Sequence, residues 1–292
     1  MSATRRRAAA RPSPRPRTAG PFDPRAIALT ITVAAAALLF VFPFYWLVVA
    51  MTHSTTEIFS SKPPLLPGDH LGENVSHLFG EAGFGRAVLN SVLAAGIYTL
   101  VGGVVCTLAG YAFATYRFRG AGLAFTLVMV MLAVPFNLTV VPLFKIMVKA
   151  DLLNTLAGLV LPNLALPFGI FLMRQTLQGF PRELVESGRL DGVGEFGILR
   201  RIVLPAMRPS LAALAIYLFL ASWNDFLWPL VLLRTSDAYT IPVSLASLHG
   251  LIDTDYGQLL SGTAISALPA AGLFLFLQRH FIAGMLAGAV KQ

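Results

Sequence analysis

The sequence predicts an all-α membrane protein with six transmembrane helices, on the basis of its composition, its apolar runs and its charge distribution. Of its 292 residues, 56% are hydrophobic and only 12% are charged, and the mean hydropathy is +0.71. Soluble domains carry about twice that charged fraction. At about 1.5 Å of rise per residue, an apolar run of about 20 residues crosses a hydrocarbon core. Six such runs lie at 26–51, 87–116, 121–148, 155–173, 211–233 and 261–277.

The first 25 residues predict a disordered, basic cytoplasmic tail. They contain seven of the 22 Lys and Arg residues and are rich in Arg, Pro and Ala, with few large apolar side chains. The run that follows is too long for the apolar part of a cleavable signal peptide, and it continues into the aromatic residues at 42–46. A basic tail directly before a first span is an orientation signal.

The remaining charges predict that both termini lie in the cytoplasm. With six crossings, 17 of the 22 Lys and Arg residues fall on the cytoplasmic side and five on the other. An excess of basic residues marks the cytoplasmic side. Pro135, Pro142, Pro162 and Pro167 lie in or near the third and fourth runs, but a bundle tolerates proline where neighbours satisfy the freed carbonyls. We therefore expect a single transmembrane domain over 26–292, with each of these two runs forming one span.

The loop between the fourth and fifth spans, residues 179–208, predicts two short helices that project from the membrane. Pro181 suits a first helical turn, and Gly192 and Gly194 end the first helix. A second helix is expected over 195–203, ended by Leu204-Pro205. Such an element suits docking of a helix into a partner's groove. An amphipathic element lying on lipid has the same pattern, which alone does not decide between them.

The residues of this loop resemble the EAA loop of binding-protein-dependent ABC importer permeases of type I. The matching segments are Glu186-Ser187-Gly188, Asp191-Gly192 and Ile202-Val203-Leu204-Pro205. Residues 189–192 are similar to the carbohydrate branch, and so, in the same order along the chain, are 90–91, 162–174, 223–225, 278–279 and 288–291. The resemblance is strongest to the smaller of the two maltose-type permease subunits. Ser187 and Gly188 replace the two alanines of the motif, and Gly188 lowers helix propensity by up to about 1 kcal/mol.

The resemblance implies a permease subunit that translocates a mono- or oligosaccharide across a bacterial inner membrane. The chain contains no G-x-x-x-x-G-K-[ST] phosphate-binding loop, so we expect it to be no enzyme and to carry no cofactor of its own. ATP and Mg would bind to a separate ATPase dimer in the cytosol. The other implied partners are a second permease subunit in a heterodimer, an extracytoplasmic substrate-binding protein and the lipid bilayer. No nucleic acid is expected, despite the net charge of +8.

The same resemblance assigns residues to contact with the ATPase. We call residues 179–208 the coupling loop. Its expected coupling residues are Glu183, Glu186, Ser187, Gly188, Asp191, Gly192, Ile202, Leu204 and Pro205. The C-terminal tail, residues 284–292, is expected to reach between the ATPase subunits through Gly288, Ala289, Val290 and Lys291, although it could instead be a frayed end.

Polar residues within the spans are the candidates for the substrate path. Asp225 would cost about 2.5–3.5 kcal/mol if it faced lipid at the bilayer centre, so it should face the bundle interior, a cavity or the outer interface. Trp223 could stack on a sugar ring, with Asn224 and Asp225 bonding to hydroxyl groups. The favoured alternative is that these residues hold two helices together. Asn137 and Asn163 are weaker candidates. The five histidines lack the spacing of a metal site.

Other functions stay open at this point. The importer could carry glycerol phosphate or another polyol. A secondary transporter would need no ATPase, but such carriers usually show internal repeats and buried ionisable relays, and Asp225 is the clear charge within a predicted span. An intramembrane enzyme is disfavoured because the spans lack paired catalytic groups.

Overall fold

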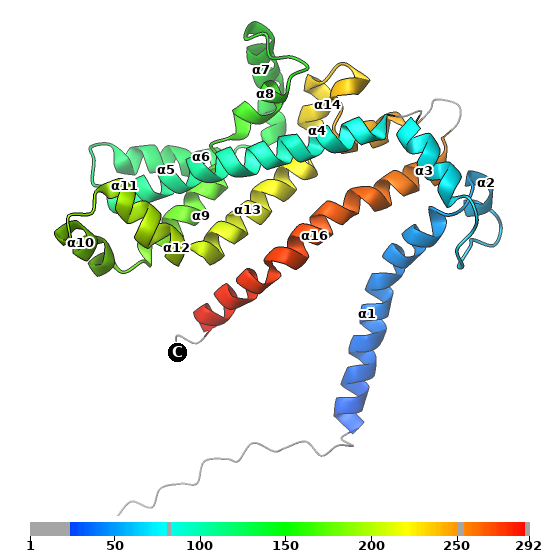
Figure 1. Cartoon of the computed structure of the whole chain (residues 1–292), viewed down its shortest axis with the longest axis horizontal. Helices are drawn as coiled ribbons and strands as arrows, with labels where there is room; N and C mark the ends of the chain where they lie inside the picture. Colours follow the sequence, from blue (N-terminus) through cyan, green and yellow to red (C-terminus); the bar gives the residue numbers. More distant parts are fainter. Residues whose placement is uncertain (1–23, 81–82, 250–253, 290–292) are drawn as a thin grey trace, which may run out of the picture. The chain divides into compact units, whose positions relative to one another are not determined.

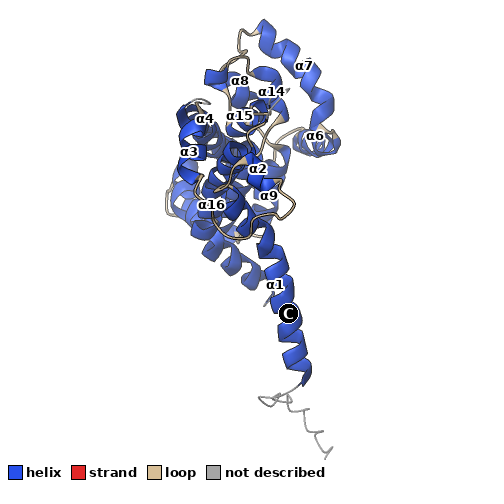
Figure 2. Cartoon of the chain, turned by 90° about the vertical axis from the view of Figure 1, so that its right-hand side faces the viewer, coloured by secondary structure: helices blue, strands red, loops and turns tan. Residues whose placement is uncertain are grey.

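The computed structural model describes residues 24–80, 83–249 and 254–289, and these residues are helical with no strand (Figure 2). The α-helices are α1 (Pro24–Ala50), α2 (Thr55–Ile58), α3 (Leu71–Gly80), α4 (Phe84–Ile97), α5 (Gly103–Thr115), α6 (Ala121–Ala133), α7 (Phe136–Lys149), α8 (Leu156–Val160), α9 (Pro167–Gln178), α10 (Arg182–Leu190), α11 (Glu195–Ile198), α12 (Leu204–Ala206), α13 (Arg208–Trp223), α14 (Leu227–Leu232), α15 (Ile241–Ser247) and α16 (Tyr256–Ala289). Short π-helical turns cover Tyr98–Gly102 and Leu199–Val203, and 3₁₀ turns cover Leu161–Asn163 and Ser236–Ala238.

The chain divides into two units, residues 1–47 and 48–292. Within the described residues, three continuous helical segments are long and apolar enough to cross a membrane: Ala26–Ala50, Phe84–Thr115 and Tyr256–Phe276. Three further pairs of helices qualify only if each bent pair counts as one span. The all-helical membrane fold is confirmed. The first two spans begin and end within three residues of the expected bounds.

The third, fourth and fifth predicted runs are not single helices. The run 155–173 divides into the segment Leu156–Asn163 and α9, which are bent by 45° before Pro167. The run 121–148 divides into α6 and α7, which are bent by 106° at Val134-Pro135. A proline disfavours helical backbone at the residue before it, and Val134 is extended. Pro142, inside α7, does not break that helix. The run 211–233 divides at Asn224–Phe226 into α13 and α14.

The second helix of the coupling loop also ends later than expected. It continues through Leu204-Pro205 to Ala206 and then meets α13 at 83°. Proline lacks the N–H of a regular helix, and its ring collides with the carbonyl four residues earlier. The π-helical turn at Leu199–Val203 widens the preceding backbone and accommodates Pro205 there.

Close packing of α5 against α9 forms the core beneath the coupling loop. A Cβ atom added at Gly110 would lie 2.6 Å from Met173 Cβ and 2.8 Å from the Arg174 backbone nitrogen. One added at Gly169 would lie 2.7 Å from Cys106 Sγ. Glycine at positions 110 and 169 therefore allows the two helices to pack closely. In Figure 1, α10–α12 lie at one end of this helix pair, whereas α2 and α3 lie at the far end of α4 and α16.

Candidate functional site

The coupling loop has a defined turn between α10 and α11. Gly192 has a φ of +76°, a conformation that glycine adopts without strain. The N–H of Val193 donates to the Gly188 carbonyl (2.9 Å), and the N–H of Gly192 donates to the Arg189 carbonyl (3.1 Å). Together these bonds form a Schellman motif, which satisfies the last carbonyls of α10. Gly194 then begins α11 in an extended conformation.

A polar triad ties this turn to the end of α5. Arg189 Nε donates to Glu195 Oε1, and the Tyr116 hydroxyl donates to Glu195 Oε2. Each donor–acceptor distance is 2.7 Å. The Arg189 guanidinium, and after it the Tyr116 hydroxyl, hold the pKa of Glu195 below its ordinary range. The Glu195 carboxylate correspondingly raises the pKa of Arg189. The second helix of the loop is thus linked both to the first helix and to α5.

The two residues that replace the alanines of the motif are accommodated differently. Ser187 is exposed, and its hydroxyl donates to the Glu183 carbonyl one turn earlier (2.7 Å). Gly188 is buried against the second helix: an added Cβ would lie 2.8 Å from Ile202 Cδ1 and 3.3 Å from Ile198 Cγ1. The small residue at 188 therefore sets the spacing of the two helices.

The outer surface of the coupling loop carries acidic and apolar side chains. Glu183, Glu186 and Asp191 are exposed, as is Pro205. Leu190 is 89% exposed and Phe196 is 73% exposed. Inside the loop, Ile202 and Leu204 pack against the core below. Large exposed apolar side chains among charged ones suit contact with another protein or with lipid.

A small cavity of about 120 Å³ lies between the coupling loop and the helices that support it. Glu186 and Arg189 line it from α10, Tyr111 from α5 and Gln178 from α9.

The C-terminal tail is described only in part. Gly288 and Ala289 belong to the last turn of α16, whereas Val290 and Lys291 lie outside the described residues.

The predicted substrate residues separate into two groups. Asn163 and Asp225 both line a pocket of about 260 Å³ in the helical bundle. Asn137 and Asn224 are exposed and are not among the residues that line it. Trp223 is only 4% exposed, stacks on Phe219 and donates from Nε1 to the Ser266 carbonyl over 3.1 Å. In this conformation Trp223 joins α13 to α16, the alternative that the sequence favoured for this cluster.

Three polar residues of this pocket were not predicted: Tyr98, Ser222 and Thr240. Tyr98 begins the π-helical turn in the second span, and Thr240 precedes α15. Their apolar or loop surroundings in the sequence gave no reason to single them out. Ser222 lies beside the Trp223–Asp225 segment, and its proximity to the helix break was the available signal.

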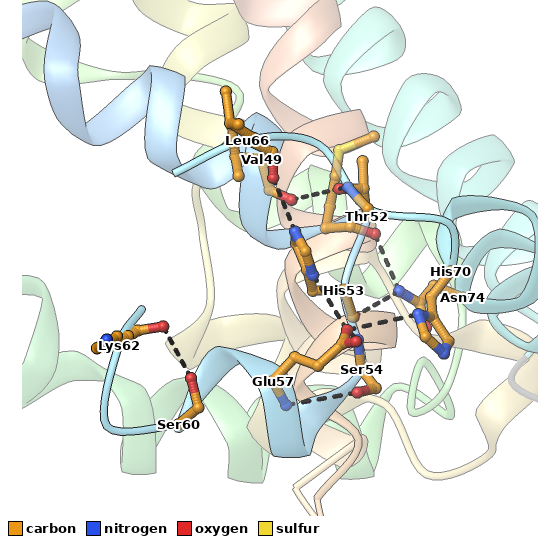
Figure 3. A network of polar contacts seen from close by, with 12 residues as sticks. Val49, Thr52, His53, Ser54, Glu57, Ser60, Lys62, Leu66, His70 and Asn74 are labelled. Carbon is orange, nitrogen blue, oxygen red and sulfur yellow. Dashed lines mark hydrogen bonds and ion pairs between the residues drawn. The ribbon is translucent and has the colours of Figure 1, made fainter. Parts of the chain in front are cut away.

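At the opposite end of the bundle, the segment after α1 is closed by its own polar contacts (Figure 3). Asn74 Nδ2 donates to the carbonyls of Met51 (2.9 Å) and His53 (3.0 Å). The ring nitrogens of His53 lie 3.0 Å from Glu57 Oε2 and 2.9 Å from the Leu66 carbonyl oxygen. The residues labelled in Figure 3 are called the outer-loop network: Val49, Thr52, His53, Ser54, Glu57, Ser60, Lys62, Leu66, His70 and Asn74. In the described part of the chain, no cluster of three or more His, Cys, Asp or Glu side chains could hold a metal ion.

Comparison with solved structures supports this architecture. The chain matches the crystal structure of a bacterial ABC transporter involved in the import of the acidic polysaccharide alginate, with a TM-score of 0.77 and 20% sequence identity. The match covers 90% of this chain and 100% of the solved one. At that identity, the likeness establishes the fold.

Comparison with protein sequences establishes the family. Residues 106–287 match the family described as binding-protein-dependent transport system inner membrane component. The chain is 40% identical to the arabinooligosaccharides transport system permease protein AraQ of Halalkalibacterium halodurans (90% of this chain, 95% of the relative). It is 36% identical to the lactose transport system permease protein LacG of Rhizobium radiobacter (87% and 92%). It is 32% identical to the sn-glycerol-3-phosphate transport system permease protein UgpE of Yersinia pestis (85% and 92%). The chain therefore belongs to the inner membrane components of binding-protein-dependent transport systems, as a multi-pass bacterial permease and not an enzyme.

Proposed function

We propose that this chain is one of two permease subunits in a carbohydrate importer, and that its coupling loop docks on a separate ATPase. The observation that carries the proposal is the surface of that loop. Exposed carboxylates at Glu183, Glu186 and Asp191 surround a helix whose Leu190 side chain is 89% exposed. An amphipathic helix with exposed apolar anchors suits a groove on a partner protein.

The internal contacts of the loop support the same role. The Tyr116–Glu195–Arg189 triad and the Schellman turn at Gly192 hold α10 in one orientation. A preorganised surface loses less conformational entropy when it binds. A loop that lay on lipid would need an apolar face toward the membrane and basic residues on its polar face. The exposed residues of α10 and its C-cap include three acids beside the base Arg189, which is paired with Glu195, so this face is not predominantly basic.

Carbohydrate is the substrate class that the relatives favour. Two of the three similar permeases named above belong to transport systems for arabinooligosaccharides and lactose. The permease of the sn-glycerol-3-phosphate system is less similar to this chain. Glycerol phosphate or another polyol is therefore the second candidate for the substrate. Thermal stabilisation of the cognate binding protein by a panel of sugars, polyols and glycerol phosphate would separate these candidates.

We also propose that six spans place both termini in the cytoplasm, with residues 1–25 as a basic tail and 284–292 as a tail toward the ATPase. The support is the distribution of Lys and Arg, 17 of 22 on the proposed cytoplasmic side. Because Cys106 is buried, single cysteines introduced at Ser13 and Ser60 can be labelled selectively. A membrane-impermeant maleimide applied from outside should label the variant at 60 and not that at 13.

The coupling role is tested with Glu186→Ala in a complex co-expressed with its genomic neighbours. We expect ATP-driven sugar uptake in proteoliposomes to fall by more than about tenfold, because one partner of a charged contact is removed. Glu73→Ala is the matched control, since Glu73 is an exposed carboxylate on α3 at the other end of the bundle. The proposal fails if no ATPase co-purifies with the complex and Glu186→Ala transports like the unaltered protein.

A further inference from the structure

We propose that the pocket of about 260 Å³ is a substrate subsite on this chain that binds an uncharged, hydroxyl-rich unit and disfavours anions. The inference deepens the proposed function and rests on it. Six residues carry it: Tyr98, Phe136, Asn163, Ser222, Asp225 and Thr240. They supply three hydroxyl groups, one amide, one carboxylate and two aromatic rings.

The hydroxyl of Thr240 supports this inference. Thr240 is 4% exposed and lines the pocket, yet its Oγ1 has no hydrogen-bond partner. A threonine in front of a helix normally uses this oxygen to cap the helix. Here Thr240 precedes α15 without capping it, and Ser91 Oγ from α4 accepts the N–H of Ile241 instead (2.8 Å). A buried, unpartnered hydroxyl in a pocket wall needs a hydrogen-bond partner that the surrounding protein does not supply.

Asn90 fixes the position of Thr240. Its Nδ2 donates to the carbonyls of Asp237 (2.8 Å) and Tyr239 (3.0 Å), directly before Thr240. Two adjacent residues of α4 therefore hold the segment 237–241 from outside the pocket. These bonds occupy the backbone of the segment and leave the Thr240 hydroxyl without a partner.

Helix interruptions from distant parts of the chain meet at this pocket. Tyr98 begins a π-helical turn, Phe136 begins α7 after the 106° bend, and Asn163 ends a 3₁₀ turn before α9. Asp225 lies in the break between α13 and α14. Irregular backbone at membrane depth is tolerated where it is buried in protein or lines a cavity, and transporters place their substrate sites at such breaks.

The charge of the pocket determines the ligand class. Among the described residues that line it there is one carboxylate, Asp225, and no Lys, Arg or His. The N–H of Trp228, in the first turn of α14, donates to Asp225 Oδ1 over a long distance of 3.4 Å. A carboxylate accepts hydrogen bonds from sugar hydroxyls and repels phosphate or carboxylate groups. The pocket therefore suits a neutral sugar or polyol and not a phosphate ester or uronate.

The size of the pocket limits what it binds. Its volume lies slightly below the range of about 300–1,000 Å³ that encloses whole drug-sized ligands. One sugar-sized unit fits such a space better than an oligosaccharide does. Tyr98 and Phe136 contribute the aromatic surface against which a sugar ring packs, as pockets generally combine apolar walls with few polar groups.

The hydroxyl is tested by equilibrium dialysis of radiolabelled lactose and arabinotriose with the purified permease–ATPase complex, in nanodiscs and without binding protein. Thr240→Val should raise the Kd by about threefold to tenfold, the loss expected for one hydrogen bond. Thr240→Ser keeps the hydroxyl and should stay within about twofold of the unaltered complex. Thr263→Val is the matched control, because the Thr263 hydroxyl donates to Leu259 within α16 and lies outside the pocket.

The charge is tested with lactobionate, the anionic counterpart of lactose. The unaltered complex should bind it at least about tenfold more weakly than lactose, and Asp225→Asn should reduce that difference. Asp255→Asn is the matched control. The N–H of Gln258 donates to Asp255 Oδ1 (3.0 Å) at the start of α16, so this variant alters a similar hydrogen bond outside the pocket.

Three outcomes would overturn the inference: no saturable binding of either neutral sugar, unchanged binding in Thr240→Val and Asp225→Asn, or a preference for lactobionate. Each leaves the proposed function intact if ATP-driven uptake and ATPase co-purification persist. Failure of ATP-driven uptake for every sugar tested would instead remove the proposed function.

Discussion

The coupling loop and the outer-loop network lie at opposite ends of the bundle and use their polar groups in different ways (Figures 1 and 3). In the outer-loop network, polar side chains bind backbone carbonyls of the same segment, as Asn74 does at Met51 and His53. In the coupling loop, Arg189 and Tyr116 hold Glu195, while Leu190 and Phe196 are exposed. The first region completes its own structure, and the second leaves a surface for a partner.

The largest expected effect on stability comes from Asn74→Ala. Asn74 is 4% exposed, and its loss removes the donor for two carbonyls, at a cost of about 1–3 kcal/mol. The thermal unfolding midpoint of the purified complex should fall. Ser76→Ala is the control, because the Ser76 hydroxyl is exposed and binds only the Glu73 carbonyl within α3. Equal midpoints for the two variants would show that the outer-loop network is not closed by Asn74.

Gly192→Ala should weaken the coupling loop by about 1–2 kcal/mol. An alanine at a φ of +76° brings its Cβ close to the following carbonyl. The Val193 amide, bonded to Gly188, should then exchange its hydrogen faster, and less ATPase should co-purify. Gly194→Ala is the matched control, since Gly194 has a φ of −65° and open space around it. The interpretation is wrong if both variants exchange at the same rate.

Gly188→Ala restores one alanine of the family motif and should change stability by less than about 1 kcal/mol. Helix propensity improves, but the new methyl group meets Ile202 Cδ1, the far end of a flexible side chain. Adding Ile202→Val to Gly188→Ala removes that contact and should make the double variant more stable than Gly188→Ala alone. Thermal unfolding of both complexes measures the difference. A double variant less stable than the single one would mean that Ile202 Cδ1 contributes packing that Gly188 does not limit.

The smallest expected effect is a pH dependence of the outer-loop network. The Leu66 carbonyl, and with it the Glu57 carboxylate, raises the pKa of His53, with a further contribution from Asp69. His70 also lies 3.5 Å from Glu57. Because the folded-state pKa is raised, the stabilisation is complete below the unfolded value of about 6.5 and is lost as the pH rises through the folded value.

Hydrogen exchange of the Gly68 amide, corrected for its intrinsic pH dependence, reports this loss, since that N–H donates to Thr52 Oγ1 in the same segment. Protection should decrease above neutral pH. His53→Gln should remove the pH dependence. If protection falls on acidification instead, His53 does not hold the segment.

Much of the fold could be predicted because span length and charge bias are properties of the sequence itself. The helices α1 and α4–α5 follow directly from apolar runs. The breaks could not be placed in the same way: Pro135 interrupts its run whereas Pro142 does not, and neighbouring segments decide which freed carbonyls are satisfied. The pocket was predicted only through Asn163 and Asp225. Tyr98 and Thr240 are 142 residues apart in the sequence, and no local pattern connects them.

The glycine-mediated contact of α5 with α9 has a mechanical consequence. Added Cβ atoms at Gly110 and Gly169 would lie 2.6–2.8 Å from the opposing helix, so the two helices pack closely. We therefore expect the pair to move together, as a single beam. At the C-terminal ends of the two helices, Tyr116 contacts the coupling loop and Gln178 lines its cavity. Just before their N-terminal ends, Tyr98 and Asn163 lie in the wall of the pocket. Displacement of the coupling loop would reach both pocket residues together and change the shape of the pocket.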